Sequence, residues 1–153
     1  MSNARDGPDE DGKEVQSGEI KILVCKDTKS KYIFTIPVPQ KGVDDTEYAV
    51  RKMLWVIGFL GYTRVMLKAD QESSIQAVFK RVKAHLGAGV VDNLPDQVVS
   101  EMSPVGDSRA NGSVERGIQS AEGQIRTLVS ALEERLGTKL HPDDCVMPWL
   151  VTH

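Results

Sequence analysis

Two β-rich runs joined by a short polar turn constrain the fold of this 153-residue chain more than any other feature. Residues 20–24 and 32–38 are rich in β-branched and aromatic side chains, and residues 27–31 between them are polar. Runs at this spacing predict an antiparallel hairpin whose second strand ends at its prolines. Asp27 falls in the turn, where its carboxylate can accept nearby backbone N–H groups.

Helical and strand patterns alternate after the hairpin. Residues 48–60 predict a helix that Asp44 or Asp45 can cap and Gly61 can end, and its broad apolar surface predicts burial. The later segments predict a strand at 63–69, an amphipathic helix at 75–86, a strand at 90–91 or 98–99, a polar loop at 104–112 and a long helix at about 114–136. A hairpin followed by this alternation predicts an α/β domain of three layers with a mixed sheet.

Charge divides the chain into two parts. Residues 1–19 hold six acidic and two basic side chains with few apolar ones, so we expect a disordered acidic arm. The arm accounts for the net charge of −3, because residues 20–153 carry 17 basic against 16 acidic side chains. The length suits one folded domain, and the overall charge argues against a histone-like nucleic-acid binder.

The cysteines and the N-terminus bear on the compartment. Cys25 and Cys145 are far apart, and neither has a neighbouring cysteine or histidine at a metal-binding spacing, so neither a disulfide framework nor a zinc finger is predicted. The polar, acidic N-terminus does not resemble a signal peptide, and no apolar run reaches the length of a membrane span. We expect a nuclear or cytoplasmic protein that is not secreted.

Two acidic residues occupy positions that suit a binding site. Asp70 follows the predicted strand at 63–69, where open α/β sheets hold ligand groups, although the local sequence alone favours a helix N-cap role. Glu115 lies in the first turn of the long helix, where the helix dipole alone favours an acid, at the edge of the apolar stripe. Together they suggest a carboxylate site for Mg²⁺.

The polar segment before the long helix adds groups that suit a phosphate ligand. Glycines at 106 and 112 allow several backbone conformations, Ser108 and Asn111 offer neutral hydrogen bonds, and Arg109 can pair with a phosphate. An ordinary surface loop has the same composition, so the segment alone does not identify a site.

Residues 103–126, SPVGDSRANGSVERGIQSAEGQIR, together with residues 67–74, LKADQESS, resemble the integrase catalytic core of LTR retroelements. The resemblance covers roughly residues 20–153. It implies a ribonuclease-H-like fold in which three acids hold two Mg²⁺ or Mn²⁺ ions, with Asp70 as the second acid and Glu115 as the third. Arg109, Asn111, Gln119 and Lys68 would contact DNA.

The same resemblance implies that part of the core is missing. The first acid of the family belongs to a central strand that precedes the hairpin, and residues 1–19 contain no match for it. The chain therefore reads as an integrase core truncated at both ends, in which DNA integration by metal-dependent polynucleotidyl transfer is impaired. The implied partners are retroelement ends and target DNA, with homo-oligomerisation as an option and no membrane. The alternative is a catalytically silent remnant that binds nucleic acid or itself.

Overall fold

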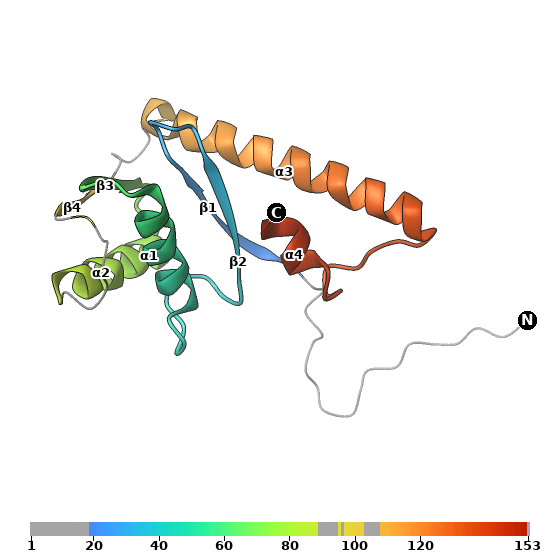
Figure 1. Cartoon of the computed structure of the whole chain (residues 1–153), viewed down its shortest axis with the longest axis horizontal. Helices are drawn as coiled ribbons and strands as arrows, with labels where there is room; N and C mark the ends of the chain where they lie inside the picture. The colour runs from blue at the N-terminus through green and yellow to red at the C-terminus, as the bar shows by residue number, and fades with distance from the viewer. Residues whose placement is uncertain (1–18, 89–94, 96, 103–107, 153) are drawn as a thin grey trace, which may run out of the picture.

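The computed structural model describes residues 19–88, 95, 97–102 and 108–152. The predicted acidic arm lies almost entirely outside these residues. Along the described chain, two strands are followed by a helix, a strand, a helix, a strand and two further helices (Figure 1).

The predicted hairpin is confirmed. Strand β1 (Lys21–Lys26) pairs antiparallel with β2 (Ile33–Val38), and Leu23 lies opposite Ile36. The carboxylate of Asp27 accepts the N–H groups of residues 29 and 30 and the hydroxyl of Ser30, which is the turn-forming role that the sequence predicted.

Helix α1 (Tyr48–Leu60) follows the hairpin and ends as expected, but its N-cap is Glu47, without a side-chain cap hydrogen bond, rather than Asp44 or Asp45. Asp44 Oδ1 accepts the N–H of Tyr48 at 2.9 Å, while Gly61 ends the helix in the left-handed conformation with φ 63°. The prediction that this helix is buried around its girth is wrong in part. Trp55 and Phe59 are 60% and 58% exposed. Helix α2 and strand β2 pack against other faces of α1 and leave these two side chains uncovered.

The next three elements form a parallel strand pair with an intervening helix. Strand β3 (Arg64–Ala69) leads into α2 (Ser73–Gly87), and β4 (Gln97–Met102) returns parallel to β3. Of the two predicted positions for this last strand, 98–99 is confirmed, while 90–91 lies outside the described residues.

Helix α3 (Ser108–Leu136) begins earlier than predicted, and a short helix α4 (Met147–Thr152) follows it. Residues 108–112 are therefore helical rather than part of a loop. The helix packs on β1 with Gly117 and Ala121, and a Cβ at residue 117 would lie 3.1 Å from Cδ of Lys26. Small residues let the helix approach the strand closely.

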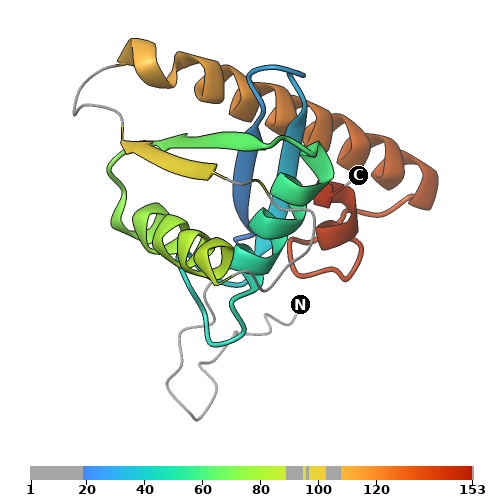
Figure 2. The same cartoon turned by 60° about the vertical axis from the view of Figure 1, so that its left-hand side comes forward.

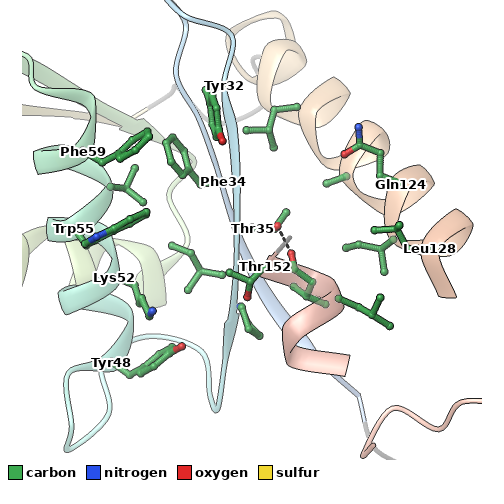
Figure 3. A pocket seen from close by; sticks show the side chains of 18 of the residues that line it. Tyr32, Phe34, Thr35, Tyr48, Lys52, Trp55, Phe59, Gln124, Leu128 and Thr152 are labelled. Atoms are coloured by element: carbon green, nitrogen blue, oxygen red, sulfur yellow. Dashed lines mark hydrogen bonds between the residues drawn. The ribbon is translucent and has the colours of Figure 1, made fainter. Parts of the chain in front are cut away.

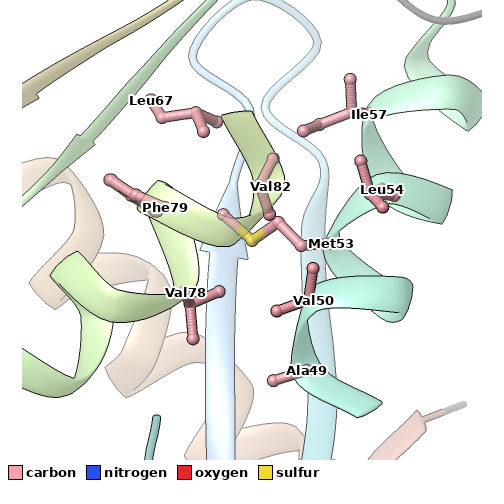
Figure 4. Packing of buried hydrophobic residues seen from close by; sticks show 9 residues of the cluster. All are labelled: Ala49, Val50, Met53, Leu54, Ile57, Leu67, Val78, Phe79 and Val82. Atoms are coloured by element: carbon pink, nitrogen blue, oxygen red, sulfur yellow. The ribbon is translucent and has the colours of Figure 1, made fainter. Parts of the chain in front are cut away.

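The main core connects the hairpin to α1, β3 and α2. Side chains from α1, β3 and α2 pack together, and partly buried residues of β1, including Leu23, lie against them (Figure 4). The buried members are Ala49, Val50, Met53, Leu54, Ile57, Leu67, Val78, Phe79 and Val82.

The architecture is α/β, with α1 and α3 on opposite sides of the hairpin (Figure 1) and the β3–β4 pair beside it (Figure 2). The expectation of one mixed sheet needs correction. The described strands form two separate two-stranded sheets, β1–β2 and β3–β4. No described strand bridges β1 and β3, so antiparallel and parallel pairing remain in separate sheets.

Candidate functional site

A groove of about 620 Å³ separates the two sheets. Residues 20–26 of the first sheet and residues 66–70 of the second form two of its walls. Helices α1 and α2 contribute Met53 and Phe79, and α3 contributes Ile118. The groove is therefore bounded by strands of both sheets and by residues of α1, α2 and α3.

Asp70 and Glu115 both line this groove, although they come from different elements. Asp70 is exposed where β3 ends, and its Oδ1 accepts the N–H of Glu72 at 3.3 Å. The N-cap of α2 is Glu72, so the alternative in which Asp70 caps this helix is wrong. Glu115 is exposed near the start of α3. Neither carboxylate forms an ion pair with another described residue.

The predicted DNA-contacting residues lie in different places. Lys68 lines the groove and pairs with Glu101 at 3.4 Å. Gln119 is exposed on α3 but does not line the groove. Arg109 and Asn111 belong to the first turns of α3, and their side chains lie outside the described part of the structure. Of the two predicted contacts whose side chains the structure describes, Lys68 lies at the groove with the two acids and Gln119 does not.

Lys80, Arg81 and Lys83 give α2 a basic face, and part of its charge is paired. Arg81 forms an ion pair with Glu47, and His85 Nε2 lies 2.6 Å from the same carboxylate. Hydrogen bonds from His85 and Arg81 lower the pKa of Glu47. Lys83 Nζ donates to the hydroxyl of Ser100 at 3.3 Å. The ion pair of Arg81 with Glu47 lowers the net positive charge of this face.

A complete metal site is not assembled from the described residues. They contain no group of three or more His, Cys, Asp or Glu side chains able to hold an ion. Mg²⁺ favours octahedral oxygen coordination and keeps water where protein ligands are few. Asp70 and Glu115 can supply carboxylate oxygens at the groove, but two carboxylates do not provide the three-acid set that the resemblance implies.

A second hollow of about 660 Å³ lies beside β2 and was not predicted from the sequence. Tyr32 and Phe34 of the hairpin line it together with Trp55 and Phe59 of α1, and the ring of Phe34 packs edge-on against Trp55 and Phe59 (Figure 3). Trp55 stacks on Phe59 with ring centroids 5.3 Å apart, and Thr35 donates from its hydroxyl to the carbonyl of residue 151. The i, i+2 and i, i+4 spacings of these aromatic pairs are the signal that could have found this cluster.

Comparison with protein families, curated proteins and solved structures yields no match to this chain. Among the helices formed by the described residues, none has the length and apolar character needed to cross a bilayer.

Proposed function

We propose that this chain is a catalytic-core fragment of a retroelement integrase, with a ribonuclease-H-like ancestry and DNA as its partner. The observation that carries the proposal is the common groove of Asp70 and Glu115. These acids are far apart in the sequence, and the resemblance to integrase cores assigns both of them to one metal site. Carboxylates on a shared groove suit a hard divalent cation beside a phosphate.

We propose further that the isolated chain transfers DNA strands poorly. In polynucleotidyl transfer, bound Mg²⁺ or Mn²⁺ activates the attacking oxygen and stabilises the leaving oxygen. Four carboxylates of the described residues line the groove, those of Asp70, Glu72, Glu115 and Glu122, but no three of them form a group that could hold an ion. We therefore assign Asp70 and Glu115 the role of cation ligands and derive no reaction step from this incomplete set.

DNA contact is proposed for four residues, of which Lys68 lines the groove. Lys68, Arg109, Asn111 and Gln119 supply two charged and two neutral hydrogen-bonding groups. Residues 20–153 carry a formal charge of only +1, so we expect binding without a strong polybasic contribution. Cations held by the carboxylates would then bring positive charge to the DNA backbone. A nuclear or cytoplasmic location accompanies this proposal.

Calorimetric titration with Mg²⁺ tests the proposed ligands. We expect weak binding by the natural chain and at least a fivefold loss in each of Asp70→Asn and Glu115→Gln. Glu122→Gln is the matched control, because Glu122 also lines the groove from α3 and is exposed. Equal loss in all three variants would indicate general acidity of the groove and would contradict the assignment.

A strand-joining assay with a labelled retroelement end tests the activity. We expect little product from the natural chain with Mg²⁺ or Mn²⁺. Robust joining that Glu115→Gln abolishes would contradict the impairment, while preserving the integrase assignment.

The second candidate is a catalytically silent domain that binds nucleic acid or itself. The absence of a three-acid cluster among the described residues and the exposed ring of Trp55 favour it. DNA binding that is salt-dependent, indifferent to Mg²⁺ and unchanged in Asp70→Asn would support this candidate over the enzyme.

A further inference from the structure

Strand β1 has one edge that is not paired with β2, and the backbone N–H and C=O groups that point out of this edge can be assigned. The N–H of Asp27 donates to the carbonyl of Tyr32 at 2.9 Å, which identifies these residues as a hydrogen-bonded pair of the antiparallel ladder. Because hydrogen-bonded and non-hydrogen-bonded pairs alternate, the N–H and C=O groups of Ile22, Val24 and Lys26 point away from β2. Pro37, which has no N–H, lies opposite Ile22 and fits this assignment.

The free edge of β3 can be assigned in the same way. The N–H of Gln97 donates to the carbonyl of Thr63, while Gln97 lies opposite Arg64 in the parallel register. In a parallel ladder, this pattern directs the backbone groups of the odd-numbered residues of β3 toward β4. The N–H and C=O groups of Arg64, Met66 and Lys68 therefore point away from β4.

Both free edges border the groove described above. Residues 22, 24 and 26 line it from β1, and residues 66 and 68 line it from β3. Within the described part of the chain, no turn, loop or cap hydrogen bond occupies these backbone groups. Two sets of unpaired strand groups along one groove form a template for a further strand.

Apolar side chains line the space between β1 and β3 on both of its faces, alongside the charged side chains described above. Leu67, Val78 and Phe79 line one side, and Val114 and Ile118 line it from α3. Met66 and Ile118 are 62% and 37% exposed, so apolar surface in the groove is left open to solvent. A strand covered on both faces has a nearly continuous apolar sequence.

The N-terminal segment of the chain, residues 1–18, does not supply such a sequence. Residues 1–18, which immediately precede the groove-lining β1 edge, carry five acidic and two basic side chains and lack a run of apolar residues. Burying these charges between two helical layers would be costly. Residues 1–18 therefore do not have the composition of a segment that could occupy the groove.

We propose that the groove between β1 and β3 binds an extended apolar segment of a partner polypeptide, which pairs with both strand edges. Six residues in extended conformation span about 20 Å and match the six-residue length of each flanking strand. The bound segment joins the two sheets into one. This inference does not depend on the proposed function, because strand pairing needs neither a cation nor DNA.

Peptide binding to the full chain tests the proposal. The probe is a fluorescent ten-residue peptide with six central valine and isoleucine residues between pairs of lysines, and its binding is followed by fluorescence anisotropy. Two further peptides carry N-methyl groups on alternate central residues, so that each loses the donors of one edge. Insertion between two edges predicts at least a tenfold loss of affinity for both methylated peptides. Unchanged binding of either one would overturn the proposal.

A proline variant tests the β1 edge directly. Val24→Pro removes a groove-facing N–H, and Ile33→Pro removes an N–H from the far edge of β2, at an equivalent non-hydrogen-bonded position of the ladder. We expect peptide affinity to fall at least tenfold in the first variant and to stay within twofold in the second. Similar affinity in both folded variants would contradict the edge assignment.

Hydrogen exchange of the natural chain provides a test that requires no variant. We expect the peptide to slow exchange at the amides of Ile22, Val24 and Lys26 and also at those of Met66 and Lys68. Protection of one strand alone would overturn insertion between both. Strong protection of these amides in the free chain, or a dimer that the peptide dissociates, would also overturn it, because residues 1–18 or a second copy would then be the occupant.

Discussion

Substitution of Asp27 by asparagine tests how the hairpin turn is fastened to the rest of the fold. The Asp27 carboxylate accepts the N–H and hydroxyl of Ser30 and also the hydroxyl of Tyr62, at 2.8 Å from Oδ2. Tyr62 lies between α1 and β3, so this carboxylate connects the first sheet to the start of the second. Asp27→Asn retains the shape of the side chain but removes its charge and one of its acceptor oxygens.

The size of the effect follows from the pKa of Asp27. Partial burial raises this pKa, but hydrogen bonds from Ser30, Tyr62 and Lys29 outweigh that effect and lower it from 3.8 to about 2. A shift of about two units corresponds to ~2.5 kcal/mol, and solvent screening at this partly exposed turn reduces the expected contribution to about 1–2 kcal/mol. Because the folded-state pKa is lowered, the stabilisation is present well above 3.8 and disappears as the pH falls through 2.

Urea unfolding at a series of pH values measures this contribution. We expect Asp27→Asn to lose about 1–2 kcal/mol at pH 7, and the difference from the natural chain to shrink between pH 4 and 2. Asp45→Asn is the control, because Asp45 is exposed and forms no hydrogen bond or ion pair with the described residues. A loss at pH 7 that persists unchanged to pH 2 would refute the charge-based explanation.

Three further substitutions or reactions test the packing and the backbone. Gly61→Ala should cost about 1 kcal/mol in thermal unfolding, because φ at residue 61 is 63° and an added Cβ meets no neighbour that could compensate or clash. Val82→Ala should cost about 2–3 kcal/mol in urea unfolding, since Val82 is fully buried in the main core; a loss below 1 kcal/mol would contradict that packing. Titration with a thiol reagent at pH 8 should modify Cys145, which is exposed, much faster than Cys25, because burial raises the pKa of the Cys25 thiol to about 12. Equal rates would contradict this difference.

The local elements could be predicted because their signals are short-range. β-branched runs around a polar turn predicted the hairpin, and Gly61 predicted the end of α1. The start of α3 was missed because Asn111 and Gly112 are weak helix formers. A penalty of about 1 kcal/mol for a glycine is small in a 29-residue helix that packs on a strand.

The pairing of strands could not be derived from the same local patterns. Residues 90–91 and 98–99 were equally good strand candidates, and parallel pairing with β3 distinguishes the second by a contact distant in sequence. The separation of the sheets also depends on tertiary packing, in which α1 and α2 contact β1 and β3 through one core. For the candidate site, Asp70 was predicted from its position at the end of a strand. The groove that it shares with Glu115 could not be predicted, because it depends on how β1, β3, α2 and α3 pack together.

The common groove makes the cation and strand proposals separable in one set of variants. Asp70 and Glu115 act through their side chains, whereas strand pairing uses backbone groups of β1 and β3. Asp70→Asn should therefore weaken Mg²⁺ binding and leave peptide affinity within twofold, while Val24→Pro should weaken peptide binding and leave Mg²⁺ binding unchanged. Loss of both ligands in both folded variants would mean that each substitution distorts the whole groove. Neither assignment would then survive, because the two sets of groups would not act independently.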